Sequence, residues 1–114
     1  MRLFEDQWVS PSLARNVAEI LCELAERRLG GVWNACGADV VDRVTFGRSL
    51  CEVFGLDPGK ITPVRMADLK LASPRPSRSG LTVDKARREL KARPLPLGQA
   101  LSQFHEEYAA AARG

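Results

Sequence analysis

The chain has 114 residues, of which 45% are hydrophobic and 27% are charged. These values indicate a single globular domain over residues 1–114 and exclude a disordered chain. The net charge of +3 suits an anionic small-molecule ligand and is too small to indicate a nucleic acid partner. No apolar run is long enough to span a membrane and the first residues carry no secretory signal, so we expect a cytoplasmic location and no membrane partner.

The three cysteines predict no redox or metal chemistry. Their number is odd and no Cys-x-x-Cys pair occurs. We interpret Cys22, Cys36 and Cys51 as reduced, partly buried thiols of a cytosolic protein.

The first third of the chain predicts a strand, a helix and a second strand. Residues 1–4 are a candidate strand, and Ser10-Pro11-Ser12 is typical of a helix start in which a serine caps the exposed N–H groups. The apolar stripe of this helix consists of Leu13, Val17, Ile20, Leu21 and Leu24. We expect Gly30-Gly31 to end it and residues 31–37 to form a strand.

The middle of the chain predicts a second helix followed by an irregular segment. Asp42 is placed to cap this helix and Gly55 to end it. Its predicted buried face consists of Phe46, Leu50, Val53 and Phe54. Residues 57–59 predict a turn, and residues 61–64 an edge strand because Pro63 cannot donate to a sheet.

The last third predicts a loop and two helices. Residues 73–80 are rich in proline and serine, which disfavours regular structure. Thr82 is placed to cap a short helix that carries Val83, Ala86 and Leu90. A final helix carries a stripe of Leu97, Leu101, Phe104 and Tyr108, and residues 109–114 are expected to fray.

These elements indicate an α/β or α+β fold that is rich in helix, with about four helices and a few short strands. Two or three short strands do not make a stable sheet by themselves. We therefore expect the chain to complete, or to pack against, another sheet.

The sequence contains no recognisable motif for catalysis or for binding a cofactor. No Gly-x-Gly-x-x-Gly follows a strand, and residues 55–60 lack the spacing and the hydroxyl of a phosphate loop. Ala112, four residues after Tyr108, stands where a proton-transfer pair would need lysine. His105 is the only histidine, which excludes a site with several histidines. We predict no catalytic residue, bound cofactor or metal in this chain.

Two clusters of residues instead suit ligand binding. Arg75 and Arg78 lie on the proline-stiffened loop, and guanidinium groups pair with phosphate through two hydrogen bonds. Asp6, Gln7 and Trp8 form a polar cluster with an aromatic ring just before the first helix. The alternative for the arginines is an ordinary solvated loop, and for the tryptophan it is core packing.

Five short motifs resemble one enzyme family. Asp6-Gln7 followed by Ser10-Pro11-Ser12 resembles the DQ-x-x-SPT stretch of dTDP-4-dehydrorhamnose reductases, members of the extended short-chain dehydrogenase/reductase superfamily. Residues 31–37 resemble the family's G-V-Y-H-x-x-G strand, and residues 54–56 match a helix that ends in Phe-Gly. Residues 75–85 resemble the RP-x-x-S-x-L-D-x-x-K stretch, and residues 88–90 continue in the same style. The matches run in register from about residue 5 to about residue 101, and residues 102–114 are the end of the last helix and its tail.

The resemblance implies the substrate-binding lobe of a sugar-nucleotide reductase or epimerase, without the Rossmann half that binds NAD(P)H in full-length relatives. It implies Arg75 for the diphosphate of a dTDP-sugar-like ligand, with Asp6 and Gln7 near the sugar or at the rim of its pocket. Trp8 and Arg78 are the remaining candidates. Such a lobe is not expected to be catalytic alone. The chain departs from the family at Asn34, where His is usual, and at Thr82, where Asp is usual.

Two other functions remain open at this stage. The lobe could be a non-enzymatic interaction or regulatory module, with a Rossmann-domain chain or a second copy of itself as partner. Arginines and lysines in residues 85–93 could contact nucleic acid weakly, although a solvated basic helix accounts for them equally.

Overall fold

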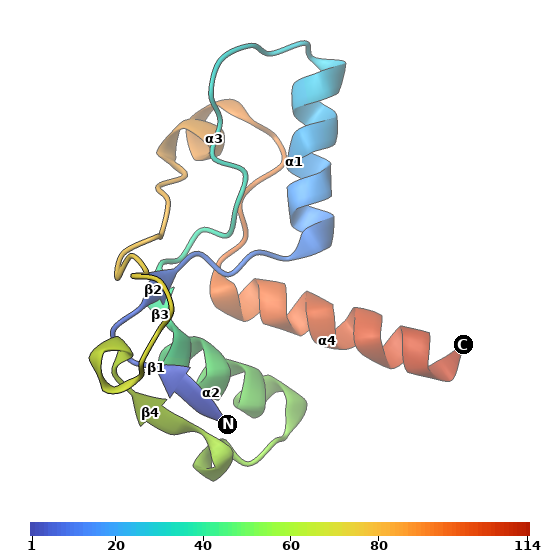
Figure 1. The fold of residues 1–114 in the computed structure, drawn as a ribbon. Coiled ribbons are helices and arrows are strands. Elements are labelled where there is room, and N and C mark those ends of the chain that lie inside the picture. The colour runs from blue at the N-terminus through green and yellow to red at the C-terminus, as the bar shows by residue number, and fades with distance from the viewer.

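The computed structural model describes all residues from 1 to 114 and contains four helices and four short strands (Figure 1). The helices are α1 (Ala14–Glu26), α2 (Arg43–Phe54), α3 (Asp84–Glu89) and α4 (Leu97–Arg113). The strands are β1 (Arg2–Phe4), β2 (Trp8–Val9), β3 (Val41–Asp42) and β4 (Thr62–Val64). This confirms the predicted helix-rich mixed fold. None of the helices is both long and apolar enough to cross a membrane.

The strands form two separate pairs. β1 and β4 are parallel, with Leu3 opposite Pro63, and β2 and β3 are antiparallel, with Trp8 opposite Asp42. α2 packs against β1 and makes contact with β3 (Figure 1). The strand predicted at the start of the chain and the extended segment at residues 61–64 are both confirmed. They pair with each other although about sixty residues separate them.

The ends of α2 follow the predicted capping. The backbone N–H of Thr45 donates to Oδ1 of Asp42 at 2.9 Å, which satisfies one of the free amides of the first turn. Gly55 ends the helix in the left-handed conformation, with φ of 64°, which glycine adopts without steric cost. The predicted buried face is wrong in detail, because Val44 and Cys51 are the buried residues and the predicted four are only partly covered.

The predicted ends of α1 are wrong. The helix starts at Ala14 without a side-chain cap because both serines bond elsewhere: the N–H of Leu81 donates to Ser10 Oγ, and that of Gly37 donates to Ser12 Oγ. It ends at Glu26, before the two glycines, and Arg28 takes the left-handed conformation with φ of 52°. Within the stripe, Leu21 is 53% exposed and Asn16 is buried instead.

Three further predictions are wrong. Residues 31–37 form no strand because no neighbouring strand bonds to them. α3 begins after Val83 without a side-chain cap, so Thr82 does not cap it, and α4 remains helical to Arg113 where fraying was expected. The apolar residues predicted for α3 are correct, since Val83, Ala86 and Leu90 are all buried.

The core is small and lies between α1 and α3. Ile20, Ala86 and Leu90 form its centre, and Trp33 and Ala35 pack against it. α4 lies against α2 and then extends away from the rest of the chain (Figure 1). Consequently Leu101 is 4% exposed, whereas Tyr108, about two helical turns further, is 59% exposed.

Candidate functional site

Residues 5–8 run from the end of β1 to the first residue of β2, and they connect the predicted ligand-binding residues to the rest of the chain. Each of the four contacts a different distant residue. Glu5 Oε1 accepts from Arg65 Nε at 3.1 Å, and the carboxylate of Asp6 accepts from the backbone N–H of Met66 at 3.0 and 3.2 Å. Asp6 therefore anchors the segment that follows β4.

Gln7 is the buried member of this group, with 5% of its surface exposed. Its Oε1 accepts a 2.6 Å hydrogen bond from Arg43 Nε, and its backbone carbonyl accepts from the Arg43 N–H at 3.2 Å. The other guanidinium nitrogens of Arg43 make no hydrogen bond or ion pair within the chain. Gln7 thus holds and orients a partly buried guanidinium at the start of α2.

Trp8 joins the N-terminal cluster to the arginine loop. Its N–H donates to the carbonyl of Ser77 at 2.7 Å, and its carbonyl accepts from both the N–H and the Oγ of Ser79 at 3.0 Å. The guanidinium of Arg78 lies over its ring, 5.7 Å from the ring centre, within the range of a cation–π contact. The loop from 77 to 81 is therefore bonded onto residues 8–10.

Arg75 lies two residues before the first of these anchoring bonds. It is exposed, and its guanidinium makes no hydrogen bond, ion pair or stacking contact with the chain. Of the five predicted residues, Trp8 and Arg78 contact each other, whereas Asp6 and Gln7 bond to Met66 and Arg43. Arg75 lies on the same loop as Arg78 with its donors free. The sequence analysis missed Arg43 and Arg65, because no motif in the sequence indicates that they contact Gln7 and Glu5.

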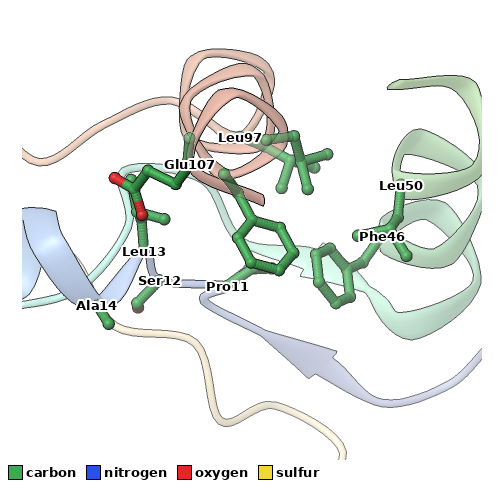
Figure 2. A pocket seen from close by; sticks show the side chains of 11 residues that line it. Pro11, Ser12, Leu13, Ala14, Phe46, Leu50, Leu97 and Glu107 are labelled. Carbon is green, nitrogen blue, oxygen red and sulfur yellow. The ribbon is translucent and has the colours of Figure 1, made fainter. Parts of the chain in front are cut away.

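An apolar cavity lies elsewhere, between the start of α1, α2 and α4 (Figure 2). Its volume is about 330 Å³, and Figure 2 shows Phe46 and Leu50 of α2 facing Leu97 of α4 across it. The ionisable residue in its wall is Glu107, which pairs with Arg15 at 3.1 Å. A cavity without cationic donors suits an apolar group rather than a diphosphate, and none of the five predicted residues lines it.

Asp42, which pairs with Trp8, and Cys36 each have a structural partner. Burial favours a raised pKa for the Asp42 carboxyl, but the hydrogen bonds from Thr45 and neighbouring amides outweigh it, so its pKa is lowered. Burial raises the pKa of the Cys36 thiol, partly offset by a hydrogen bond with Ser10. No group of three or more histidine, cysteine, aspartate or glutamate side chains is arranged to hold a metal ion.

Comparison with known proteins gives consistent results. The RmlD substrate binding domain family matches residues 1–110. A probable low-salt glycan biosynthesis reductase of Haloferax volcanii is 39% identical over 88 residues, covering 77% of this chain and 29% of that protein. A dTDP-4-dehydrorhamnose reductase of Mycobacterium tuberculosis is 35% identical over 79 residues, covering 68% of this chain and 26% of that protein.

The fold agrees with solved structures as well. The dTDP-4-dehydrorhamnose reductase of Bacillus anthracis, solved in complex with NADP, superposes with a TM-score of 0.84 at 17% identity, over 94% of this chain and 38% of that one. The chain thus spans 29% or less of the curated relatives it matches. With the family's profile covering nearly its whole length, this chain belongs to the RmlD substrate-binding domain family.

Proposed function

We propose that this chain binds a nucleotide sugar through the face formed by Trp8, Arg75 and Arg78, with Asp6 and Gln7 at its rim. The observation that carries the proposal is the bonding of the 77–81 loop to residues 8–10. It joins two predicted clusters that lie 71 residues apart in the sequence. The relatives' names, which specify dTDP-sugar and glycan reductases, support the same ligand class.

The charges of this face suit a diphosphate. Arg75 has all of its guanidinium donors free, and Arg78 is held in place by the Trp8 ring. A guanidinium that is already oriented loses less conformational entropy when it binds a phosphate oxygen. Arg43 is a further cation, partly covered and oriented by its hydrogen bond to Gln7.

Binding without catalysis is the second part of the proposal. The chain has no recognisable pair of residues for proton transfer and no glycine-rich cofactor turn. We therefore expect NAD(P)H to be bound by the remaining part of full-length relatives rather than by these residues. The three cysteines, none of which is paired, support the cytoplasmic location that a nucleotide-sugar ligand implies.

Calorimetric titration with a dTDP-sugar tests the site. Arg75→Ala is expected to weaken binding about tenfold or more, because a charge-assisted contact to phosphate is lost. Arg88→Ala on α3 is the matched control, since it removes the same charge from an exposed position that makes no side-chain bond. An unchanged Kd for Arg75→Ala would remove that residue from the site.

Thermal denaturation with and without ligand tests the function as a whole. A dTDP-sugar in large excess over its Kd is expected to raise Tm, because it binds only the folded chain. NADPH at the same concentration is expected to leave Tm unchanged. A shift with NADPH and none with any nucleotide sugar would contradict the proposal.

An interaction module is the second candidate, and one observation favours it. The chain exposes 7800 Å², whereas a compact monomer of its 12.5 kDa mass exposes about 6,200 Å². A Rossmann-domain chain or a second copy of this chain could cover the difference. A stable assembly that shows no response to nucleotide sugars would favour this function.

A further inference from the structure

The loop that carries Arg75 starts and ends at the same short segment of the chain. At its start, the N–H of Met66 donates to the carboxylate of Asp6 at 3.0 and 3.2 Å. At its end, the carbonyl of Ser77 accepts from the N–H of Trp8 at 2.7 Å. The loop between these bonds thus leaves and returns to neighbouring residues, as in an Ω-loop, and it is the yellow segment beside β2 in Figure 1.

Few other contacts hold residues 67–76 in place. Their hydrogen bonds all stay within residues 65–71, and no charged side chain among them forms an ion pair. Leu69 and Leu71 are half-buried, and the other side chains, including that of Arg75, are exposed. The position of Arg75 therefore depends on the bonds at the two ends of the loop.

The two ends are fastened by different kinds of group. At the end of the loop, Trp8 uses its backbone N–H and carbonyl, which no change of its side chain removes. At the start, the acceptor is the half-buried side chain of Asp6, and both of its oxygens lie within bonding distance of the Met66 N–H. Gln7, between them, bonds to Arg43 instead. Asp6 is therefore the side chain through which the start of the loop can be released.

We propose that Asp6 is a positioning residue for Arg75 and does not itself contact the ligand. This inference rests on the proposed function and gives Asp6 a different role from the residues that bind. A carboxylate repels the phosphates of a diphosphate, so a direct contact there would oppose binding. The bond to Met66 instead restricts the loop before the ligand arrives, and a loop that is already ordered loses less conformational entropy on binding.

Calorimetric titration with dTDP, which has the diphosphate but no sugar, tests the sign of the effect. If Asp6 acted through its charge alone, its removal would tighten the binding of an anion. We expect the opposite for Asp6→Ala, a Kd raised about threefold to tenfold, the range of one net hydrogen bond, because the start of the loop is released. Asp6→Asn loses the charge but keeps an oxygen that accepts from Met66, so its Kd is expected to equal or fall below the wild-type value.

A double-mutant cycle identifies the residue through which Asp6 acts. Where Arg75 is already replaced by alanine, adding Asp6→Ala is expected to change the Kd by less than about twofold, because no guanidinium remains at residue 75 to be positioned. A direct contact between Asp6 and the sugar predicts instead a loss of affinity for a dTDP-sugar that is absent for dTDP and persists without Arg75. That result would overturn the proposal.

Trypsin cleavage after Lys70 measures the order of the loop without any ligand. Asp6→Ala is expected to raise the cleavage rate at least about threefold, because cleavage follows local opening. Glu5→Ala is the matched control, since it removes the same charge from the neighbouring residue, whose bond is to the exposed side chain of Arg65. Its cleavage rate is expected to match that of the wild type. Equal rates for folded Asp6→Ala and the wild type would also reject the positioning role.

The wild type supplies the measurements that need no variant. The amide of Met66 is expected to exchange its hydrogen slowly, and rapid exchange would contradict the inference even if Asp6→Ala fails to fold. A wild type that binds neither dTDP nor a dTDP-sugar would end both the proposed function and this inference. A wild type that binds dTDP with the same Kd as Asp6→Ala would reject the positioning role alone.

Discussion

Two regions of the molecule are held together by different kinds of hydrogen bond. Around α2, the strands β1 and β4 pair backbone to backbone, in a parallel register that places Leu3 opposite Pro63. Around α1 and α3, polar side chains bond to backbone groups instead. Asn16 donates to the carbonyl of Arg93 at 2.8 Å and accepts from the N–H of Leu95 at 3.1 Å.

Glu23 makes the same kind of connection about two helical turns further along α1. Its carboxylate accepts from the N–H groups of Lys91 and Ala92 at 3.0 and 2.7 Å, and from Arg27 at 2.6 Å. The segment after α3 is thus fastened to α1 by two side chains, where the other region uses strand pairing. The region around α1 and α3 has no strand pairing and depends on individual polar side chains. Single substitutions there should therefore lower the free energy of unfolding more than substitutions around α2.

The largest expected effect comes from glycine substitutions in the two regions. A Cβ at Gly37 would overlap the backbone carbonyl of Pro11, which cannot move without displacing the start of α1. We expect Gly37→Ala to lower the free energy of unfolding by about 3 kcal/mol, the upper range for overpacking. Chemical denaturation at neutral pH measures this.

Gly47→Ala is the matched substitution in α2. Its Cβ would meet the ends of two flexible side chains, Leu3 Cδ1 at 2.6 Å and Ile61 Cδ1 at 3.0 Å. Alanine also favours a helix interior over glycine by about 1 kcal/mol, which offsets the crowding. We expect a net change of about 1 kcal/mol or less. Equal losses for the two variants would remove the contrast between the regions.

The next effect in size is the loss of Asn16. This residue is 3% exposed, and Asn16→Ala leaves the partly buried carbonyl of Arg93 and N–H of Leu95 without partners. We expect the free energy of unfolding to fall by about 3 kcal/mol or somewhat less. Urea denaturation is the measurement, and Glu19→Ala, on the exposed face of the same helix, is expected to change stability by no more than about 0.5 kcal/mol.

The same contrast explains which parts of the fold could be predicted. Asp42 and Gly55 act within a few residues of their own position, so their capping roles follow from the sequence alone. Asn16 and Glu23 act on residues that lie about seventy positions away, and a polar residue on a helix otherwise indicates a solvated face. Residues 31–37 were predicted to be a strand from the glycines at both ends, but a strand also needs a partner, and the structure places none beside them.

The candidate site divides in the same way. Asp6, Gln7, Trp8, Arg75 and Arg78 were predicted from local composition and from family motifs, and they stay a prediction until a ligand is measured. Arg43 and Arg65 reach the same four-residue segment from other elements, and no spacing in the sequence indicates those contacts. A sequence indicates which side chains could bind a ligand, whereas the residues that hold those side chains in position are known only from the fold.

The smallest expected effect is a dependence of stability on pH that belongs to Glu23. Hydrogen bonds from the backbone amides of Ala92 and Lys91, followed by the contact with Arg27, hold the pKa of this carboxyl below its usual value of 4.5. A group whose pKa is lower in the folded chain stabilises it above pH 4.5, and this contribution is lost as the pH falls through the folded pKa. The side chain of Glu23→Gln cannot titrate, so the Tm of this variant should fall less than that of the wild type between about pH 5 and about pH 3, the range around the usual carboxyl pKa. Glu19→Gln, at a position that makes no side-chain hydrogen bond, should follow the wild-type curve. If both variants follow it, the carboxylate of Glu23 does not connect α1 to the segment after α3 in solution, and Asn16 alone fastens that region.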